Sequence, residues 1–340
     1  MLRASLNCSL PSAGCHLYSS QRVALTESLH ADQSDRYRLN DERCVRLSGC
    51  RVRRLVIAKS IRRLFASALP LRFPASREPA GTVRRERIVI ASPDTIFYAI
   101  GDVHGCYDQL RRLEDAILVD GSQFDERKHI VMLGDYVDRG PNSAAVLEHL
   151  SSELPPGFER TSLCGNHEQE MLGFLEDPDG HANWLRLGSD ATLKSYGIDL
   201  EHLLELYGGD LSAVRDVLLD AMPAEHIATL RGLASIAVAN DIVFVHAGLR
   251  PGFELERQSE EDLLWIRNPF LERGPELPVF VVHGHTPVEK PVFRPGRLGI
   301  DTGAFKTGRL TAARIFRRHV HLMHTRRSGD VDVSPDTFVI

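Results

Sequence analysis

Residues 96–105 read Ile-Phe-Tyr-Ala-Ile-Gly-Asp-Val-His-Gly, and this stretch decides the fold. Its first five residues form a short apolar run that ends at a glycine, and polar side chains follow. A short apolar run bounded by glycine is typical of a buried strand that ends in a loop. The same pattern recurs along the chain, before a glycine or a histidine, at residues 129–133, 161–164, 242–245 and 279–282.

Helical segments separate the first three apolar runs. Residues 107–118 and 143–150 are the candidates, and Pro141 fits the start of the second helix. Strand, loop, helix and strand at intervals of about 30 residues form the pattern of βαβ units. We therefore predict an α/β fold whose functional loops gather at the carboxyl ends of its strands.

Three of these loops are rich in metal-binding side chains. They read GDVHG at 101–105, GDYVDRG at 134–140 and GNHE at 165–168, and later strand ends add His246 and the pair His283 and His285. The loops lie 33 and 31 residues apart, counted from Asp102 to Asp135 and from Asp135 to Asn166. One βαβ repeat per step returns the chain to the same sheet edge, so we expect these side chains to converge.

The mixture of carboxylate, amide and imidazole groups indicates which metals the site would take. It suits manganese, iron or zinc better than calcium or magnesium, which prefer oxygen ligands. These side chains suffice to bind two metal ions. Two metal ions held close together can bind the oxygens of a phosphoester and lower the pKa of a bound water. The sequence has no phosphate-binding Gly-x-x-x-x-Gly-Lys loop and no serine nucleophile elbow, so we disfavour nucleotide-driven transfer and serine-hydrolase chemistry.

Five blocks in order resemble the PPP-type (calcineurin-like) metallophosphoesterases, a family that includes serine/threonine protein phosphatases and symmetrical diadenosine tetraphosphatases. The blocks are GDVHG, GDYVDRG, GNHE, HAGL at 246–249 and GHTP at 284–287, and the resemblance covers about residues 95–315. It implies a four-layer α/β/β/α sandwich. The helices inserted after the third block and the short C-terminal end resemble the bacterial branch.

The resemblance also implies roles for the loop residues. His167 resembles the acid that protonates the leaving group, and Asp138 resembles the carboxylate that orients it; a nearby carboxylate favours the imidazolium form. The implied ligands of two metal ions, with Asp135 shared between them, are Asp102, His104 and Asp135 for the first ion and Asn166, His246 and His285 for the second. The role of His283 stays open.

Arginines are expected to bind the phosphate. Arg139 follows Asp138 in the second block, and a guanidinium fork matches phosphate oxygens. The segment 263–267 resembles the one that supplies a second arginine, which makes Arg267 the candidate. Arg250, directly after HAGL, is a weaker candidate.

The chain divides into regions of different composition. Residues 1–90 carry 17 Lys and Arg against 7 Asp and Glu, and we predict a basic, disordered extension there. A cationic amphipathic helix at 55–73, with a membrane-surface or targeting role, is the alternative for part of it. We predict a metallophosphoesterase domain over 91–325, with a helical insertion at about 181–233, and a C-terminal tail over 326–340. Within the insertion, apolar residues at three- and four-residue steps predict a helix over 184–193.

Composition narrows the class of protein. The formal net charge of −5 leaves the region after residue 90 acidic, which argues against general nucleic-acid binding. No apolar stretch reaches the length of a membrane-spanning helix, and only Cys106 and Cys164 fall in the predicted domain. We expect a cytoplasmic protein with no membrane span.

Three functions remain open at this point. A phosphatase acting on phosphoserine and phosphothreonine proteins is the first choice. The alternative is hydrolysis of a dinucleoside polyphosphate, such as symmetrical cleavage of diadenosine tetraphosphate, or removal of a nucleotide cap from RNA. A non-catalytic binding module would lack a ligand or the acid, and this sequence lacks neither.

Overall fold

The computed structural model describes residues 84–90 and 94–340. Most of the predicted extension, with its candidate helix at 55–73, lies outside the described residues. Strand β1, Arg87–Val89, is the exception within 1–90, because it pairs in parallel with β5 in one of the two sheets. The sheet structure therefore includes residues that we had assigned to the extension.

One six-stranded sheet holds the predicted βα units, and we call it the β2 sheet. One half of it is three parallel strands in the order β2, β3, β4, and an antiparallel meander of β10, β11 and β12 forms the other half beyond β2. The strands are β2 Thr95–Ile100, β3 Arg127–Met132, β4 Phe158–Ser162, β10 Thr311–Phe316, β11 His319–Thr325 and β12 Val331–Val339.

The other sheet, which we call the β6 sheet, has the strand order β1-β5-β6-β7-β9-β8 and is mixed. Strands β6, β7 and β9 run parallel, as do β1 and β5, whereas β5 with β6 and β8 with β9 pair antiparallel. The bounds are β5 Ile236–Ala239, β6 Ile242–Val245, β7 Phe280–His283, β8 Val292–Arg294 and β9 Arg297–Gly299.

Alternation along β2 explains why the two sheets stack. Ile96, Tyr98 and Ile100 point to one face and pack against helices α1 (Tyr107–Gly121) and α2 (Ser143–Ser151), with their side chains fully buried. Phe97 and Ala99 point to the other face and join a second cluster with residues of the β6 sheet. One strand thus contributes to two cores.

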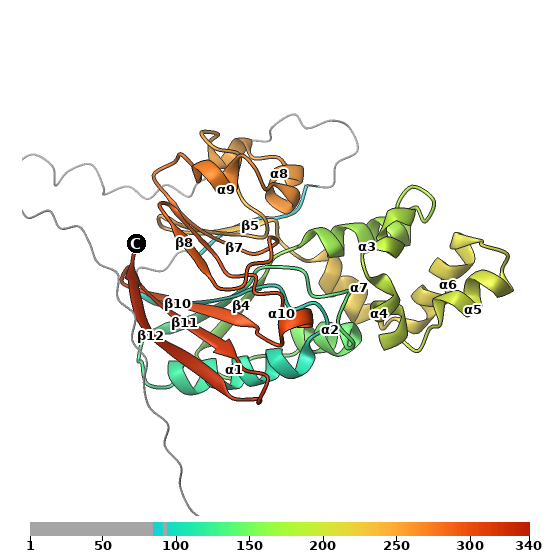
Figure 1. The fold of residues 1–340 in the computed structure, drawn as a ribbon, viewed down its shortest axis with the longest axis horizontal. Helices are drawn as coiled ribbons and strands as arrows, with labels where there is room; N and C mark the ends of the chain where they lie inside the picture. The colour runs from blue at the N-terminus through green and yellow to red at the C-terminus, as the bar shows by residue number, and fades with distance from the viewer. Residues whose placement is uncertain (1–83, 91–93) are drawn as a thin grey trace, which may run out of the picture. The chain divides into compact units, whose positions relative to one another are not determined.

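A third cluster covers the outer face of the β6 sheet. It joins Val243, Val245 and Val281 to residues of the short helices α8 (Glu260–Trp265) and α9 (Phe270–Arg273). Figure 1 shows the resulting order of helices, sheet, sheet and helices. The predicted four-layer α/β/β/α sandwich is confirmed.

The predicted insertion is helical and follows α3, Asn166–Glu176. The side chains of Asp199 and Asp210 accept backbone N–H groups in the first turns of α5 and α6, which sets where these helices begin. The insertion extends away from the sheets in Figure 1. It consists of the 3₁₀ turn η1 Ala182–Arg186, then α4 Ser189–Ser195, α5 Leu200–Leu206, α6 Leu211–Ala221 and α7 Ala224–Arg231.

Two local expectations differ from the structure. The helical pattern at 184–193 breaks at Gly188, whose φ of 103° is a left-handed conformation that interrupts a helix. Residues 326–340, expected to be a tail, include the edge strand β12, which pairs with β11. Two short elements, η2 Leu255–Arg257 and α10 Ala304–Thr307, complete the structure. No helix within 84–90 and 94–340 is both long and apolar enough to cross a bilayer.

Candidate metal centre

The loops that follow β2, β3 and β7 hold candidate residues in unusual backbone conformations. His104, Asp135, Asp138, Arg139 and His285 all have φ between 44° and 69°, in the left-handed region that side chains other than glycine rarely adopt. Such strain persists only where the surrounding structure fixes it, and it gathers at functional sites. The loops are therefore shaped to present these side chains.

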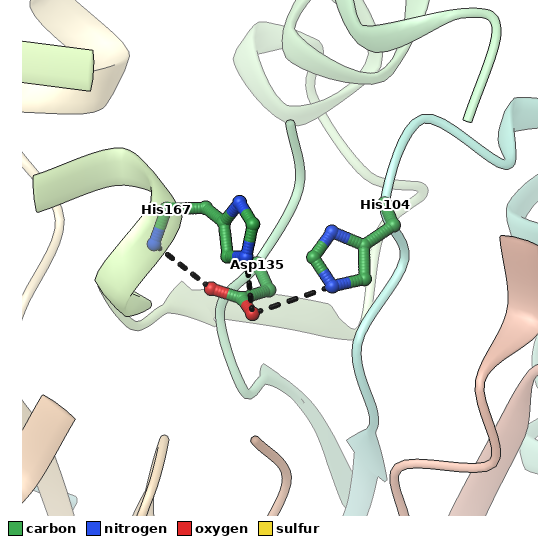
Figure 2. Close-up of side chains that lie close together, drawn as sticks. All are labelled: His104, Asp135 and His167. Atoms are coloured by element: carbon green, nitrogen blue, oxygen red, sulfur yellow. Dashed lines mark hydrogen bonds and ion pairs between the residues drawn. The ribbon is translucent and has the colours of Figure 1, made fainter. Parts of the chain in front are cut away.

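Asp135 lies at the middle of the cluster, and its two carboxylate oxygens face different imidazoles. Oδ2 lies 3.4 Å from Nε2 of His104 and 3.8 Å from Nε2 of His167. Figure 2 shows the Asp135 carboxylate between the two imidazoles. Oδ1 lies 3.4 Å from Nε2 of His246. One carboxylate thus reaches two separate groups of nitrogen donors.

The second group surrounds the side-chain amide of Asn166. Its Oδ1 lies 3.0 Å from Nε2 of His246 and 2.8 Å from Nδ1 of His285. The backbone N–H of His285 donates to the carboxylate of Asp102, at 3.0 Å from Oδ2. The structure therefore brings together all six residues predicted as metal ligands, and all six are buried.

The tautomers of two histidines test whether these groups fit a metal ion. Nδ1 of His246 donates to the carbonyl of Leu133 at 2.8 Å, and Nδ1 of His104 donates to that of Val137 at 2.9 Å. In a neutral imidazole the Nε2 atom then carries a lone pair. Nε2 of His246 faces the acceptor oxygens of Asn166 and Asp135, an arrangement that a cation between them would stabilise. These residues fit a divalent metal.

The charge states of the ligands point the same way. Burial lowers the pKa of His104 and of His285 to about 3, and it also lowers the pKa of His246, so all three are neutral near pH 7. Burial alone would raise the pKa of Asp135, but the surrounding imidazoles outweigh it and lower the pKa. Neutral imidazole and ionised carboxylate are the forms that bind metal ions.

His167 differs from the histidines that are predicted to be metal ligands. Burial would lower its pKa, but the carboxylates of Asp135 and Asp138 outweigh burial and raise it. Its Nδ1 lies 2.7 Å from Oδ2 of Asp138, and its Nε2 points toward Asp135. Among the described residues, the groups with the spacing of metal ligands are His104, Asp135 and His167, and Asp135, His246 and His285. His167 is thus close enough to the first group to meet a phosphate held there.

The structure places the three candidate arginines differently. Nη1 of Arg139 donates to Nε2 of His104 at 2.8 Å, so this guanidinium lies at the centre. Arg267 is exposed, and its charge is one of the influences that lower the pKa of His285. Arg250 instead binds the carboxylate of Asp262 through Nε and Nη2, at 2.8 and 2.5 Å. These two donors of its guanidinium are therefore already engaged.

Sequence reasoning assigned no role to Glu168, although the structure gives it one. Its carboxylate accepts the backbone N–H groups of Asp135, Tyr136, Val137 and Gly165, at 2.6 to 3.1 Å. It therefore fixes the loop that carries Asp135 and Arg139. The available signal was its position three residues after Gly165, where a glutamate reaches back over the start of a helix.

Asp301 is a second residue without a predicted role. It is buried, its charge helps to raise the pKa of Asp102, and burial raises its own pKa to about 6. Its Oδ1 accepts the backbone N–H of Gly303 at 2.9 Å. Asp301 lies within residues 95–315, which the family resemblance covers without assigning a role to this carboxylate.

The remaining histidines and cysteines have structural surroundings. His283 ends β7, and its Nε2 accepts from Nη1 of Arg297 at 3.2 Å while its ring lies edge-on to Phe270. His226 is buried, and it bonds the hydroxyl of Tyr196. Cys106 and Cys164 are buried free thiols, and burial raises the pKa of both.

Comparison with known proteins places this geometry in a family. The family model described as calcineurin-like phosphoesterase matches residues 96–321. A symmetrical bis(5'-nucleosyl)-tetraphosphatase from Dechloromonas aromatica is 25% identical over 282 residues, and the alignment covers 66% of this chain and 94% of that protein. An asymmetrical bis(5'-nucleosyl)-tetraphosphatase PrpE from Geobacillus thermodenitrificans is 24% identical over 242 residues, covering 63% and 88%. A symmetrical relative from Legionella pneumophila is 34% identical over 161 residues, covering 47% of each.

The matched region contains every residue of the centre described above, from Asp102 to Asp301. It spans well over half of the chain, and the resemblance seen in the sequence blocks is confirmed. This chain belongs to the calcineurin-like phosphoesterase family, and it is a hydrolase.

Proposed function

We propose that this chain hydrolyses a phosphoanhydride bond with a water activated by two divalent metal ions, and that its substrate is a dinucleoside polyphosphate. The observation that carries the two-metal mechanism is the placement of Asp135. Its Oδ2 faces His104 and His167, and its Oδ1 faces His246, as a carboxylate shared between two ions would.

The same geometry supports the ligand assignment that the family resemblance implies. When bound, the two ions would bind phosphate oxygens and acidify a water at neutral pH. Manganese is the metal we expect, with iron or zinc as alternatives, because nitrogen and oxygen donors are mixed. We assign Asp102, His104 and Asp135 to the first ion, and Asp135, Asn166, His246 and His285 to the second.

His167 is the proposed acid. Its raised pKa keeps the proton that an alkoxide or phosphate leaving group needs, and Asp138 fixes the ring through Nδ1. Arg139 would bind the phosphate oxygens beside the first ion, since its guanidinium already lies 2.8 Å from a ligand of that ion. Arg267, exposed and near His285, is proposed for the second contact, whereas Arg250 is occupied by Asp262.

Two observations support a dinucleoside polyphosphate as the substrate. The curated relatives described above are named as bis(5'-nucleosyl)-tetraphosphatases. Phe305 is 39% exposed, lies edge-on to His104 at 5.4 Å between ring centroids, and sits under the Arg139 guanidinium at 5.2 Å. An exposed aromatic ring beside the phosphate site gives a nucleobase a surface on which to stack.

A phosphoserine or phosphothreonine protein is the second candidate substrate, and it was the first choice from sequence alone. The five sequence blocks support it, because their order is shared with the serine/threonine phosphatases of the resemblance. Both reactions displace an oxygen from phosphorus at the same centre. We favour the dinucleoside polyphosphate over the phosphoprotein because of the relatives' names and the position of Phe305.

The test is a comparison of rates on one preparation. The purified full chain, loaded with manganese, is assayed on diadenosine tetraphosphate and on a phosphothreonine peptide. We expect kcat/KM to be at least about 100-fold higher on the nucleotide, a preference that substrate-specific binding contacts can supply. An equal or higher value on the peptide would overturn the substrate assignment. Activity on neither substrate, with manganese bound, would overturn both substrate assignments.

A further inference from the structure

We propose that Trp184 and Thr192 of the helical insertion are positioning residues that hold the Asp138 carboxylate, so that His167 directs its proton at the leaving group. The inference rests on the proposed role of His167 as the acid. It assigns the insertion a part in the reaction, which neither the sequence blocks nor the family match gives it.

The hydrogen bonds of Asp138 come from both sides of its carboxylate. Oδ1 accepts the hydroxyl of Thr192 at 2.7 Å. Oδ2 accepts the indole N–H of Trp184 at 3.1 Å and the Nδ1–H of His167 at 2.7 Å. Asp138, Trp184 and Thr192 are all fully buried, so these donors replace the water that an exposed carboxylate would have.

The direction of the Thr192 hydroxyl follows from its neighbours. The backbone N–H of Asp138 donates to Oγ1 of Thr192 at 2.8 Å, and Oγ of Ser143 lies 3.0 Å from the same atom. Ser143 can donate its hydrogen there because its own oxygen accepts the N–H of Asp138, at 3.1 Å. The single hydrogen of Thr192 is then left for the carboxylate, which fixes Oδ1 in one orientation.

Local backbone structure explains how two insertion residues reach one carboxylate. Gly188, between η1 and α4, has a φ of 103°, and its carbonyl accepts the backbone N–H of Arg139 at 3.0 Å. A Cβ at Gly188 would lie 2.9 Å from Cγ of Arg139, so the close approach requires glycine. The turn therefore places Trp184 before it and Thr192 after it against the same loop.

The bonds from Trp184 and Thr192 affect the direction in which His167 donates its proton. They do not involve the proposed metal ligands. Oδ2 of Asp138 is the acceptor for the Nδ1–H of His167, and that bond sets the plane of the imidazole and the direction of Nε2. If Oδ1 loses its donor, the carboxylate can rotate and the ring loses its fixed orientation. Neither Trp184 nor Thr192 bonds a proposed metal ligand among the described residues, so metal binding should stay unchanged.

The test uses two substrates that differ in how much they need the acid. Phenolate is a basic leaving group and benefits from protonation, whereas 4-nitrophenolate delocalises its charge and leaves without a proton. For Thr192→Val and Trp184→Phe we expect kcat on phenyl phosphate to fall about 10- to 100-fold, part of what general acid catalysis contributes. On 4-nitrophenyl phosphate we expect a fall of less than about 3-fold.

Two matched variants separate positioning from packing. Thr192→Ser keeps the hydroxyl and should restore kcat on phenyl phosphate to within about 3-fold of wild type. Ser195→Ala removes another hydroxyl of α4, one that bonds Ala144 and the carbonyl of Thr192, and it should leave the ratio of the two rates unchanged. Manganese content and melting temperature are measured for every variant.

The outcomes distinguish the inference from the function on which it rests. His167→Asn is assayed in parallel. If it slows both substrates equally, the acid role fails and the inference falls with it. If His167→Asn discriminates between the substrates but Thr192→Val and Trp184→Phe do not, the proposed function stands and the positioning role is wrong. An equal fall on both substrates in the insertion variants would also overturn it.

Discussion

Nδ1 of His167 lies 2.7 Å from Oδ2 of Asp138, and both side chains are closed off from solvent. This pair distinguishes His167 from the histidines around it. His104 is equally buried, and burial lowers its pKa to about 3, whereas nearby carboxylates raise the pKa of His167. One buried centre therefore keeps one imidazole ready to donate a proton and leaves the others neutral, as metal ligands must be.

Replacing Asp138 by Asn should move the pH dependence of the reaction. Asp135 and Asp138 raise the pKa of His167, so removing one charge lowers that pKa. An acid works only while protonated, and the alkaline limb of the kcat profile should therefore move to lower pH. We expect kcat on phenyl phosphate near neutral pH to fall about 100-fold, within the range of general acid catalysis.

The matched control for this variant is Asp190→Asn, which removes an exposed aspartate of α4 that pairs with Lys194. Its kcat profile should overlay that of the wild type. The measurement is kcat against pH with manganese saturating at each point. An alkaline limb that stays in place in Asp138→Asn would contradict the acid assignment.

Replacing Phe305 by Ala tests the proposed nucleotide substrate. The ring is 39% exposed beside Arg139 and His104, and stacking of a base on an aromatic side chain contributes about 1–3 kcal/mol. We expect KM for diadenosine tetraphosphate to rise about 10-fold, and KM for 4-nitrophenyl phosphate to change less than about 2-fold. Phe253→Ala is the control, because Phe253 is 41% exposed and also lies under an arginine, Arg257. Equal KM changes for the two substrates would argue against base stacking.

The strands and the convergence of the candidate metal ligands could be predicted from the sequence because both follow from local patterns. Residues 96–100 are apolar, and the candidate ligands Asp102 and His104 follow within four positions. The same short stretch therefore predicts both the end of the strand and the ligands. The bonds from Trp184 and Thr192 to Asp138 join residues 46 and 54 positions apart. No local pattern encodes such pairs, since a tryptophan and a threonine at helical spacing are equally consistent with simple packing.

Two of the local features that differ from expectation, β12 and the turn at Gly188, have physical causes as well. In β12 the alternation of residues 331–334 is short and a proline follows at position 335, which argues against a strand. The pairing of β12 with β11 supplies the missing stabilisation. At 184–193 the helical spacing of apolar residues continues across Gly188. The structure has a turn there, where the carbonyl of Gly188 accepts the backbone N–H of Arg139. Tertiary contacts override local propensity in both places.

Glu114 should make the stability of the domain depend on acid pH. Its burial would raise its pKa, but hydrogen bonds and charges from His149 and Arg160 outweigh burial and lower it below the usual 4.5. A carboxyl whose pKa is lower in the folded state contributes stability above the unfolded pKa and loses it as pH falls through the folded value. Its bonds to Arg160 are 2.8 and 3.1 Å long.

We therefore expect Glu114→Gln to lower the free energy of unfolding by about 1–3 kcal/mol at pH 7. The difference from wild type should shrink toward pH 4, where the wild-type carboxyl begins to bind its proton. Urea unfolding at both pH values measures it. Glu176→Gln, at the exposed end of α3, is the control and should leave stability within about 0.5 kcal/mol. If the difference in the free energy of unfolding between wild type and Glu114→Gln grew toward pH 4, the pKa of Glu114 would be raised on folding, and the prediction would be wrong.

Replacing Asp135 by Asn should weaken the binding of both metal ions. Replacing a residue that is assigned to one ion only, such as His285, should weaken the binding of that ion alone. Oδ1 of Asp135 faces His246, Oδ2 faces His104, and asparagine offers one uncharged oxygen in place of both. We expect the wild type to bind about two manganese ions per chain, Asp135→Asn fewer than one, and His285→Asn about one. Asp120→Asn, which loses bonds to Tyr98 and Arg314 elsewhere in the fold, should bind as many ions as the wild type.

Stability gives an independent measure of the same assignment. A ligand that binds only the folded state at 100 times its Kd adds about 2.7 kcal/mol to the free energy of unfolding. Saturating manganese should therefore raise the melting temperature of the wild type most, that of His285→Asn less, and that of Asp135→Asn least. If Asp135→Asn bound metal and gained stability as the wild type does, its carboxylate would not be shared. The two imidazole groups would then have to be assigned to separate sites.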